Sequence, residues 1–424
     1  MTRSESPEIV FSMVQHPLLF TVLSWLLACG ALVACSGPSA VASAPGQAGS
    51  GAGGGAASAG TSPGGTSAGG AGSGGASAGT SPAGAGGASA GSAGTNPGGS
   101  GGSAPIVCPG DSTDSSGVGQ ADGSEGAPQL LSQAGLFQAD MQTLASGVRP
   151  FQPQYQLWAD GATKRRWISL PDGTQINTQD MDFWDFPVGT RVFKEFSRNG
   201  IRIETRMLLK RPNENWMRVA YQWRADQTEA DQVPCGVTDS HGTPHDIPSA
   251  KTCGTCHLRM PDKLIGFSAL QLAHDSDDPT AWTLARLSAE GRLSQPPTAI
   301  PKIPGDEKAR AALGYMHANC GHCHSPRSSV TSRISILLWL QTDSLADVAS
   351  TTSYRTSVAQ KTLAEEGPPG VKAIIDPGSP QTSSLFVRIA ARGPGYSMPP
   401  VATNEIDPVG RQAIEDWIVS LGNQ

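Results

Sequence analysis

Two stretches of the chain repeat one arrangement of cysteine and histidine. Residues 253–257 read C-G-T-C-H, and residues 320–324 read C-G-H-C-H. Two cysteines three positions apart lie about one helical turn apart, so each can form a thioether bond to a vinyl group of a haem. The histidine that follows then directs its imidazole at the iron from the same side. The spacing therefore predicts two covalently attached haem c groups.

A zinc site or a thiol-redox site is the alternative for a C-x-x-C pair. A zinc ribbon needs two such pairs that converge, with no systematic histidine after each pair. The histidine after both pairs therefore favours haem. The expected haem-binding residues are Cys253, Cys256 and His257 in the first motif and Cys320, Cys323 and His324 in the second.

The ligand on the other side of each iron must come from elsewhere in the chain. Met398 precedes two prolines, which favour an extended loop, and its thioether sulfur is a soft ligand. We expect Met398 opposite His324, a pairing that raises the haem potential. Met260 follows His257 too closely to reach the opposite face, so His245, on a nearby proline-flanked loop, is the first choice for the first motif. Further candidates there are His241, His274, His317, Met207 and Met217.

The N-terminal part of the chain has the features of an export signal. Residues 17–34 form an apolar run of the length of a signal-peptide core, and residues 32–35 read L-V-A-C. This end resembles the lipobox of bacterial lipoproteins, in which Cys35 is acylated after cleavage. A membrane-spanning anchor is the alternative, although the run is short for a span. We expect an exported protein of the periplasm or cell surface, tethered to the outer membrane by its lipid.

A low-complexity segment follows the expected signal. Residues 36 to about 105 are almost wholly Gly, Ala, Ser, Thr and Pro, which cannot bury apolar surface and form a flexible coil. We interpret this segment as a disordered tether. The chain of 424 residues has a net charge of −6, which argues against a nucleic-acid partner.

Cys108 and Cys235 remain once the cysteines of the signal region and the two motifs are set aside. In an oxidising compartment such a pair is expected to form a disulfide. Two unpaired buried thiols are the alternative.

The segment between the tether and the first motif carries strand signals. Residues 163–223 hold several alternating runs, and Asn199-Gly200 is a strong hairpin signal. These features predict an antiparallel meander, one sheet of a small β-sandwich. No catalytic carboxylate pair or Ser/His arrangement stands out here, and we interpret the tryptophans as core residues.

Two helices are predicted around the second motif. Residues 306–324 have apolar positions at helical spacing and lead into it. Asp407 and Pro408 suit the N-cap and first position of a second helix that runs to about Leu421.

With these elements in view, residues 303–424 resemble a class I cytochrome c domain. Residues 150–424 as a whole resemble a family of bacterial dihaem c-type cytochromes, in which F-P-V-G-T (here 186–190) and E-T-R (204–206) recur before the first motif. The tether resembles those of myxobacterial lipoproteins. The resemblance implies haem binding and electron transfer with a partner redox protein, and it implies no substrate.

The sequence thus predicts a multidomain chain with a disordered N-terminal tether, an antiparallel β-rich domain and a mostly α-helical cytochrome c-like region with two haem motifs. One-electron transfer is the expected function. The alternatives are a peroxidase-like enzyme with an open first haem, and a β-domain binding module that relays electrons from a dehydrogenase. The expected boundaries are 1–35 for the signal peptide, 36–127 for the tether, 128–240 for the sandwich-like β domain, 241–302 for the first haem segment and 303–424 for the cytochrome c domain.

Overall fold

The fold was obtained as a computed structural model, which describes Cys108 and residues 123–423 except 213–214, 332–333, 363–366, 394 and 402. The expected signal peptide, Cys35 and the greater part of the expected tether lie outside the described residues. No helix of the described ranges is both long and apolar enough to cross a membrane.

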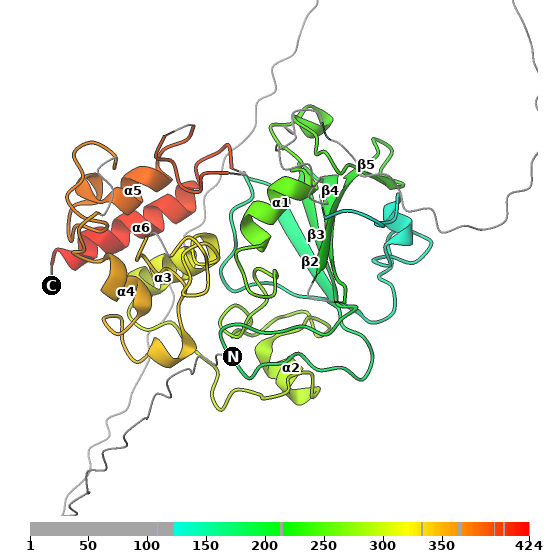
Figure 1. The fold of residues 1–424 in the computed structure, drawn as a ribbon, viewed down its shortest axis with the longest axis horizontal. Coiled ribbons are helices and arrows are strands. Elements are labelled where there is room, and N and C mark those ends of the chain that lie inside the picture. The colour runs from blue at the N-terminus through cyan, green and yellow to red at the C-terminus, as the bar shows by residue number, and fades with distance from the viewer. Residues whose placement is uncertain are drawn as a thin grey trace, which may run out of the picture. The chain divides into compact units, whose positions relative to one another are not determined.

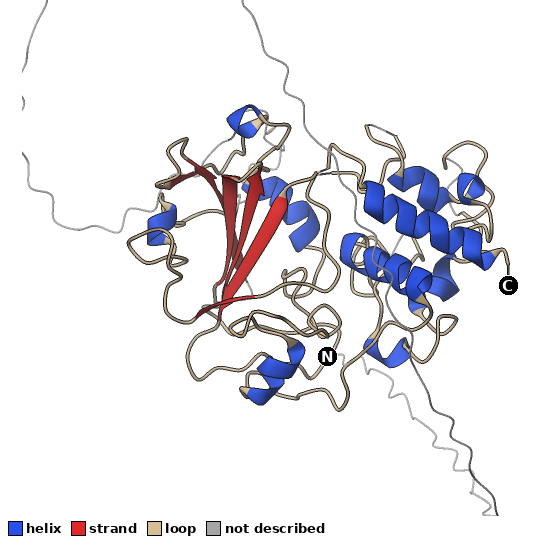
Figure 2. Ribbon diagram, turned by 180° about the vertical axis from the view of Figure 1, so that it is seen from behind, coloured by secondary structure: helices blue, strands red, loops and turns tan. Residues whose placement is uncertain are grey.

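A six-stranded antiparallel sheet forms the first part of the described chain (Figures 1 and 2). Its strands are paired in sequence order, as the predicted meander requires. Between β3 and β4, Asn199 and Gly200 both have positive φ angles of 50° and 80°, the geometry of a tight hairpin. The hairpin prediction is confirmed. The strands are β1 Val148–Pro150, β2 Thr163–Ser169, β3 Arg191–Arg198, β4 Ile201–Lys210, β5 Trp216–Trp223 and β6 Ala230–Gln232.

One face of the sheet is apolar. Trp167, Phe193, Met207 and Tyr221 are buried there, against the segment 131–141 that precedes the sheet. A sandwich would cover this face with a second sheet, but the described residues form a single sheet, and irregular chain covers the face instead. The sandwich-like prediction is corrected accordingly, because alternation identifies a buried face and not the element that covers it.

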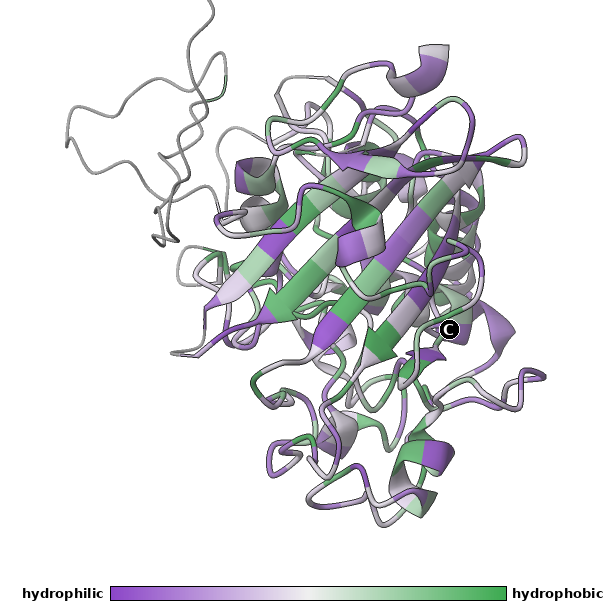
Figure 3. Ribbon diagram, turned by 90° about the vertical axis from the view of Figure 1, so that its right-hand side faces the viewer, coloured by the Kyte–Doolittle hydropathy of each residue, from purple (hydrophilic) through white to green (hydrophobic). Residues whose placement is uncertain are grey.

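The opposite face is divided into an apolar half and a charged half. Ile168, Val192 and Leu208 lie side by side across three strands and pack with Phe267 and with helix α2 (Leu284–Ala289). Polar and apolar residues alternate along the strands in Figure 3. Helix α1 (Ala250–His257), which carries the first motif, packs near β5.

Helices form the C-terminal part of the chain. Helix α3 (Glu307–Asn319) begins at Asp306, whose side chain accepts a hydrogen bond from the Ala309 N–H. Helix α6 (Pro408–Leu421) begins at Asp407 in the same way, so both predicted helix starts are confirmed. Helix α3 ends at Asn319, earlier than predicted, and the second motif follows it in a turn. The other helices are α4 Thr352–Ser357 and α5 Ser384–Ile389, with 3₁₀ turns η1 Leu131–Gln133, η2 Ser240–Gly242, η3 Thr342–Ser344 and η4 Pro380–Thr382.

Helices α3 and α6 cross in close contact (Figures 1 and 2). Leu313 and Met316 of α3 are buried with Trp417 of α6. Gly410 permits the close approach, because a Cβ atom at this position would lie 1.9 Å from the ring of Tyr315. The second motif follows directly from the end of this packed helix.

A disulfide joins Cys108 to Cys235, with the sulfurs 2.07 Å apart. These two cysteines belong neither to the two motifs nor to the signal region. The bond ties the start of the described chain to the segment that follows β6.

Candidate functional site

The first motif is carried by a short capped helix. The Ser249 side chain accepts a hydrogen bond from the Thr252 N–H at the start of α1. The helix places Cys253 and Cys256 one turn apart and ends at His257. The three expected attachment residues therefore project from one element.

The imidazole of His257 is held in one tautomer. Its Nδ1 lies 2.5 Å from the backbone carbonyl of Lys263, which can only accept a hydrogen bond. The proton is therefore on Nδ1, and Nε2 carries the lone pair. Burial and the charge of Lys194 hold the pKa of His257 well below its usual value, so the ring is neutral, as a metal ligand must be.

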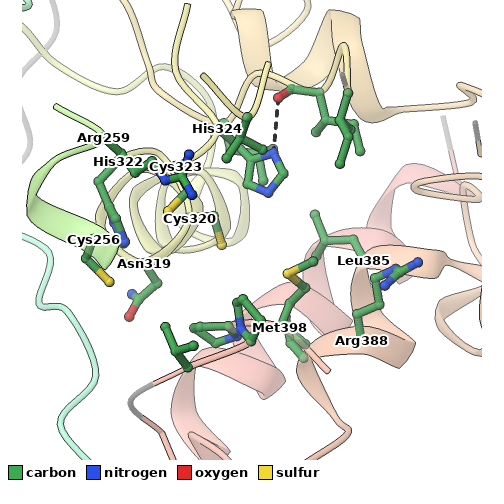
Figure 4. A pocket seen from close by; sticks show the side chains of 18 of the residues that line it. Cys256, Arg259, Asn319, Cys320, His322, Cys323, His324, Leu385, Arg388 and Met398 are labelled. Atoms are coloured by element: carbon green, nitrogen blue, oxygen red, sulfur yellow. Dashed lines mark hydrogen bonds between the residues drawn. The ribbon is translucent and has the colours of Figure 1, made fainter. Parts of the chain in front are cut away.

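His324 of the second motif repeats this arrangement. Its Nδ1 donates to the Ile336 carbonyl at 3.3 Å, drawn as the dashed line in Figure 4, and burial lowers the pKa of the ring. A metal-binding histidine usually donates its other ring N–H to a carboxylate, a backbone carbonyl or water, which fixes its orientation. Each motif thus presents Nε2 for a metal.

A cavity of about 360 Å³ adjoins the second motif. Cys320, Cys323 and His324 line it, and Met398 lines it as well, on the other side from His324 in Figure 4. The backbone N–H of Met398 donates to the Arg388 carbonyl at 3.0 Å, and this hydrogen bond holds Met398 in place. Most of the remaining wall is apolar, from Val330, Ile334, Ile336, Leu338, Ile374, Leu385 and Ile389.

The two motifs meet at this cavity. Cys256 and Arg259, from the first motif and the turn after it, line the same cavity as Cys320 and Cys323 (Figure 4). Arg259 also donates to the Ser329 hydroxyl at 2.5 Å, which ties the turn after α1 to the segment after the second motif. Residues far apart in sequence thus form one site.

Buried positive charge surrounds the first motif. Arg166, Lys194 and Arg206 lie in register across β2, β3 and β4 on the charged half of the sheet. Arg206 pairs with the buried carboxylate of Glu204. Arg166, Lys194 and the nearby Lys164 make no ion pair with any residue that the structure describes. Their hydrogen-bond partners are an amide, an imidazole and a backbone carbonyl. Such a surface fits a ligand that brings carboxylates of its own.

Lys194 contacts the first motif directly. Its Nζ lies 3.3 Å from Nε2 of His257, and the side chain is only 8% exposed. Burial, with the charges of Arg166 and Arg206, lowers the pKa of Lys194 to about 7. A strand of the sheet therefore presents an amine to the nitrogen that the first motif keeps for a metal.

His245, which we expected to bind the first iron, contacts a buried carboxylate of the sheet. Its Nε2 lies 2.7 Å from an oxygen of Glu204, and both side chains are buried. The nitrogen that we expected to bind the first iron is thus engaged with a carboxylate. A buried glutamate on β4 faces this loop, a contact that the sequence around His245 does not indicate.

Four of the other five sequence candidates for the first motif have partners or packing positions elsewhere. His241 and His274 lie within hydrogen-bonding distance of backbone carbonyls. Met207 and Met217 are buried in the core on the other face of the sheet. His317 accepts from the Leu340 N–H through Nδ1, while its buried Nε2 has no hydrogen-bond partner among the described residues.

The donor set fits haem better than a bare metal ion. In the described ranges no group of three or more His, Cys, Asp or Glu side chains is arranged to hold a metal ion. The apolar cavity, the two carbonyl-fixed imidazoles and the excess of buried cations match a flat apolar ring that carries iron and carboxylates.

The chain matches no protein-family model, and no curated protein or solved structure is significantly similar to it.

Proposed function

We propose that the chain is an exported dihaem c-type cytochrome that transfers single electrons. The observation that carries the proposal is the shared geometry of the two motifs. In each, the imidazole keeps Nε2 for a metal while Nδ1 donates to a backbone carbonyl, and thiols of both motifs line one cavity.

The residues have separate tasks in this proposal. Cys253 and Cys256 hold one haem, and Cys320 and Cys323 hold the other, while His257 and His324 bind the irons. Met398 binds the second iron from the other side of the cavity. When bound, each haem supplies a reversible one-electron couple. The apolar wall keeps water from the second site and thereby tunes its potential.

The shared cavity supports electron exchange within one chain. Cys256 of the first motif and Cys323 of the second face the same cavity, so electrons need not leave the protein to pass between the two sites. One site can then receive an electron from a donor protein while the other delivers it to an acceptor.

In this proposal the N-terminal part of the chain serves export and attachment to the membrane. The proposed lipid on Cys35 anchors the protein to the outer membrane, and the low-complexity segment from residue 36 to about 105 gives the redox part reach toward its partner. The disulfide between Cys108 and Cys235 is consistent with an oxidising compartment.

The test is a haem count. The protein, expressed in a host that attaches haem c, is expected to carry two haems by intact mass and by absorbance of the pyridine complex. Replacing both cysteines of either motif by serine is expected to leave one. Redox titration of the wild type is expected to show two one-electron steps. A protein that carries zinc, or no covalent haem, would contradict the proposal.

A further inference from the structure

A second, smaller cavity lies against the charged half of the sheet. It measures about 20 Å³, and its wall includes Lys164 and Arg166 of β2 and Lys194 of β3. Arg166 is paired in register with Lys194, and Lys164 precedes Arg166 on the same side of its strand, so the three side chains share one face. Among the described residues, no aspartate or glutamate lines this cavity. Its wall therefore carries cationic side chains and no carboxylate.

Arg166 brings a positive charge into the interior. The residue is 5% exposed, and its guanidinium donates to the side-chain oxygen of Gln156 at 3.2 Å. Burial lowers the pKa of Arg166 to about 10, so the guanidinium is still protonated at neutral pH. A neutral amide satisfies one N–H but balances no charge, and a buried charge without a counter-charge is costly. The fold therefore favours a negative charge beside Arg166.

Lys164 is a second cationic side chain on this wall. Its Nζ donates to the Leu157 carbonyl at 3.2 Å and lies 4.8 Å from the centroid of the Phe196 ring, so both contacts are with neutral groups. Glu204 lies near enough to favour the charged form of Lys164, but its carboxylate already binds Arg206 and contacts His245. That single carboxylate cannot also balance Lys164 and Arg166.

Gln271 adds a neutral donor to the same wall. The residue is 3% exposed, and its Oε1 accepts a hydrogen bond from the Tyr155 N–H at 3.0 Å. This bond assigns the amide oxygen and leaves the NH₂ group, which has no acceptor among the described residues. The wall thus presents guanidinium, ammonium and amide hydrogens, which suit a ligand that accepts hydrogen bonds and carries negative charge.

The size of the cavity narrows the choice of ligand. A cavity needs about 10–15 Å³ to hold one water molecule, so about 20 Å³ accommodates one species of that size. Chloride is only slightly larger than water, whereas sulfate and phosphate are too large, and a haem carboxylate would bring a ring for which this cavity has no room. Water itself would satisfy hydrogen bonds without balancing the charge.

We propose that this cavity binds one small monatomic anion, chloride or another halide, held by Arg166, Lys164 and Gln271. Lys194 lines the cavity but is left out of the assignment, because it contacts His257. The inference goes beyond the proposed function and does not depend on it. An anion that binds only the folded state stabilises that state, so chloride is a structural ligand of the sheet.

The test compares the thermal unfolding of the full chain in sodium chloride and in sodium gluconate of equal ionic strength. Gluconate is too large for the cavity and therefore reports only the general effect of salt. The wild type is expected to unfold about 2–4 °C higher in chloride, once chloride is in about fivefold excess over its dissociation constant. Bromide is expected to act as chloride does.

Two variants identify the site. Arg166→Met is expected to abolish the difference between the two salts. Arg224→Met, which removes an exposed arginine paired with Asp231 outside the cavity, is expected to keep it. Equal unfolding temperatures of the wild type in the two salts, or an unchanged chloride effect in Arg166→Met, would overturn the inference.

A crystal structure of the wild type grown in sodium bromide locates the anion directly and needs no variant to fold. An anomalous bromine peak in contact with the side-chain nitrogens of Arg166 and Lys164 is expected. A water molecule or a haem carboxylate at this position, with no bromine peak, would overturn the inference. The number of attached haems tests the proposed function separately, because the bromine peak is expected whatever that number is.

Discussion

Nε2 of His245 lies 2.7 Å from a carboxylate oxygen of Glu204, and the guanidinium of Arg206 binds the same carboxylate. Glu204 and Arg206 act electrostatically on Cys253 of the first motif, where cations otherwise outnumber acids. Although burial opposes it, the charges and hydrogen bonds of Arg206 and His245 lower the pKa of Glu204. Glu204 thus supplies the negative charge that balances Arg206 on the charged half of the sheet.

Glu204→Gln is expected to destabilise the protein by about 3 kcal/mol, because it leaves Arg206 buried without its counter-charge. The free energy of unfolding in urea, followed by circular dichroism, measures the change. Asp231→Asn, which breaks the exposed pair with Arg224, serves as the control and is expected to cost less than about 1 kcal/mol. Equal losses in the two variants would contradict the assignment.

Asp182 gives the protein a pH dependence of the opposite sign to an ordinary ion-paired carboxylate. Burial raises its pKa to about 6, although it accepts a hydrogen bond from the Thr342 N–H. The folded state therefore holds a proton that the unfolded state has lost, and stability falls as the pH rises from about 4 to 6. Asp182→Asn is expected to remove this slope and to stabilise the protein at pH 7 by more than about 1 kcal/mol. Thermal unfolding between pH 4 and pH 7 tests this, and an unchanged slope would exclude Asp182 as its source.

Met398→Ala is expected to lower the potential of one haem and to leave the other unchanged, since loss of the thioether removes the ligand that raises the potential. Redox titration followed by visible absorbance reports both potentials. Met398→His is the companion variant: low spin is expected to be retained at a lower potential. If Met398→Ala shifts neither step, Met398 is a packing residue of its loop.

Gly410→Ala is expected to cost about 1–3 kcal/mol, because the added methyl meets the Tyr315 ring where α3 and α6 cross. Thermal unfolding gives the size of the loss. Adding Tyr315→Ala to Gly410→Ala should recover part of it relative to the sum of the two single variants. Strict additivity would show that the two residues do not interact.

Local signals predicted the local structure well. Asn199-Gly200 indicated the hairpin, and Asp306 and Asp407 indicated the starts of α3 and α6, because turns and caps depend on a few neighbouring residues. The motif spacing likewise indicated which thiols and imidazoles would project together.

The partners of the first motif could not be predicted in the same way. The alternation of residues along β3 and β4 shows which side chains lie on the same face of the sheet as Lys194 and Arg206. A face with such charged residues is normally expected to be exposed to water. It is buried here because α1, distant in sequence, packs on it. The engagement of His245 with Glu204 depends on the same long-range packing.

The meeting of the two motifs has a consequence for how the protein matures. Besides the disulfide of Cys108 and Cys235, the described part of the chain holds four free thiols, and Cys256 and Cys323 line one cavity. A disulfide between these two would take one thiol from each of the two proposed attachment pairs. Burial raises the pKa of Cys320 to about 12 and that of Cys323 to about 11, so the thiolates that attack disulfides are scarce. The packing that buries these thiols therefore also lowers their reactivity toward disulfides.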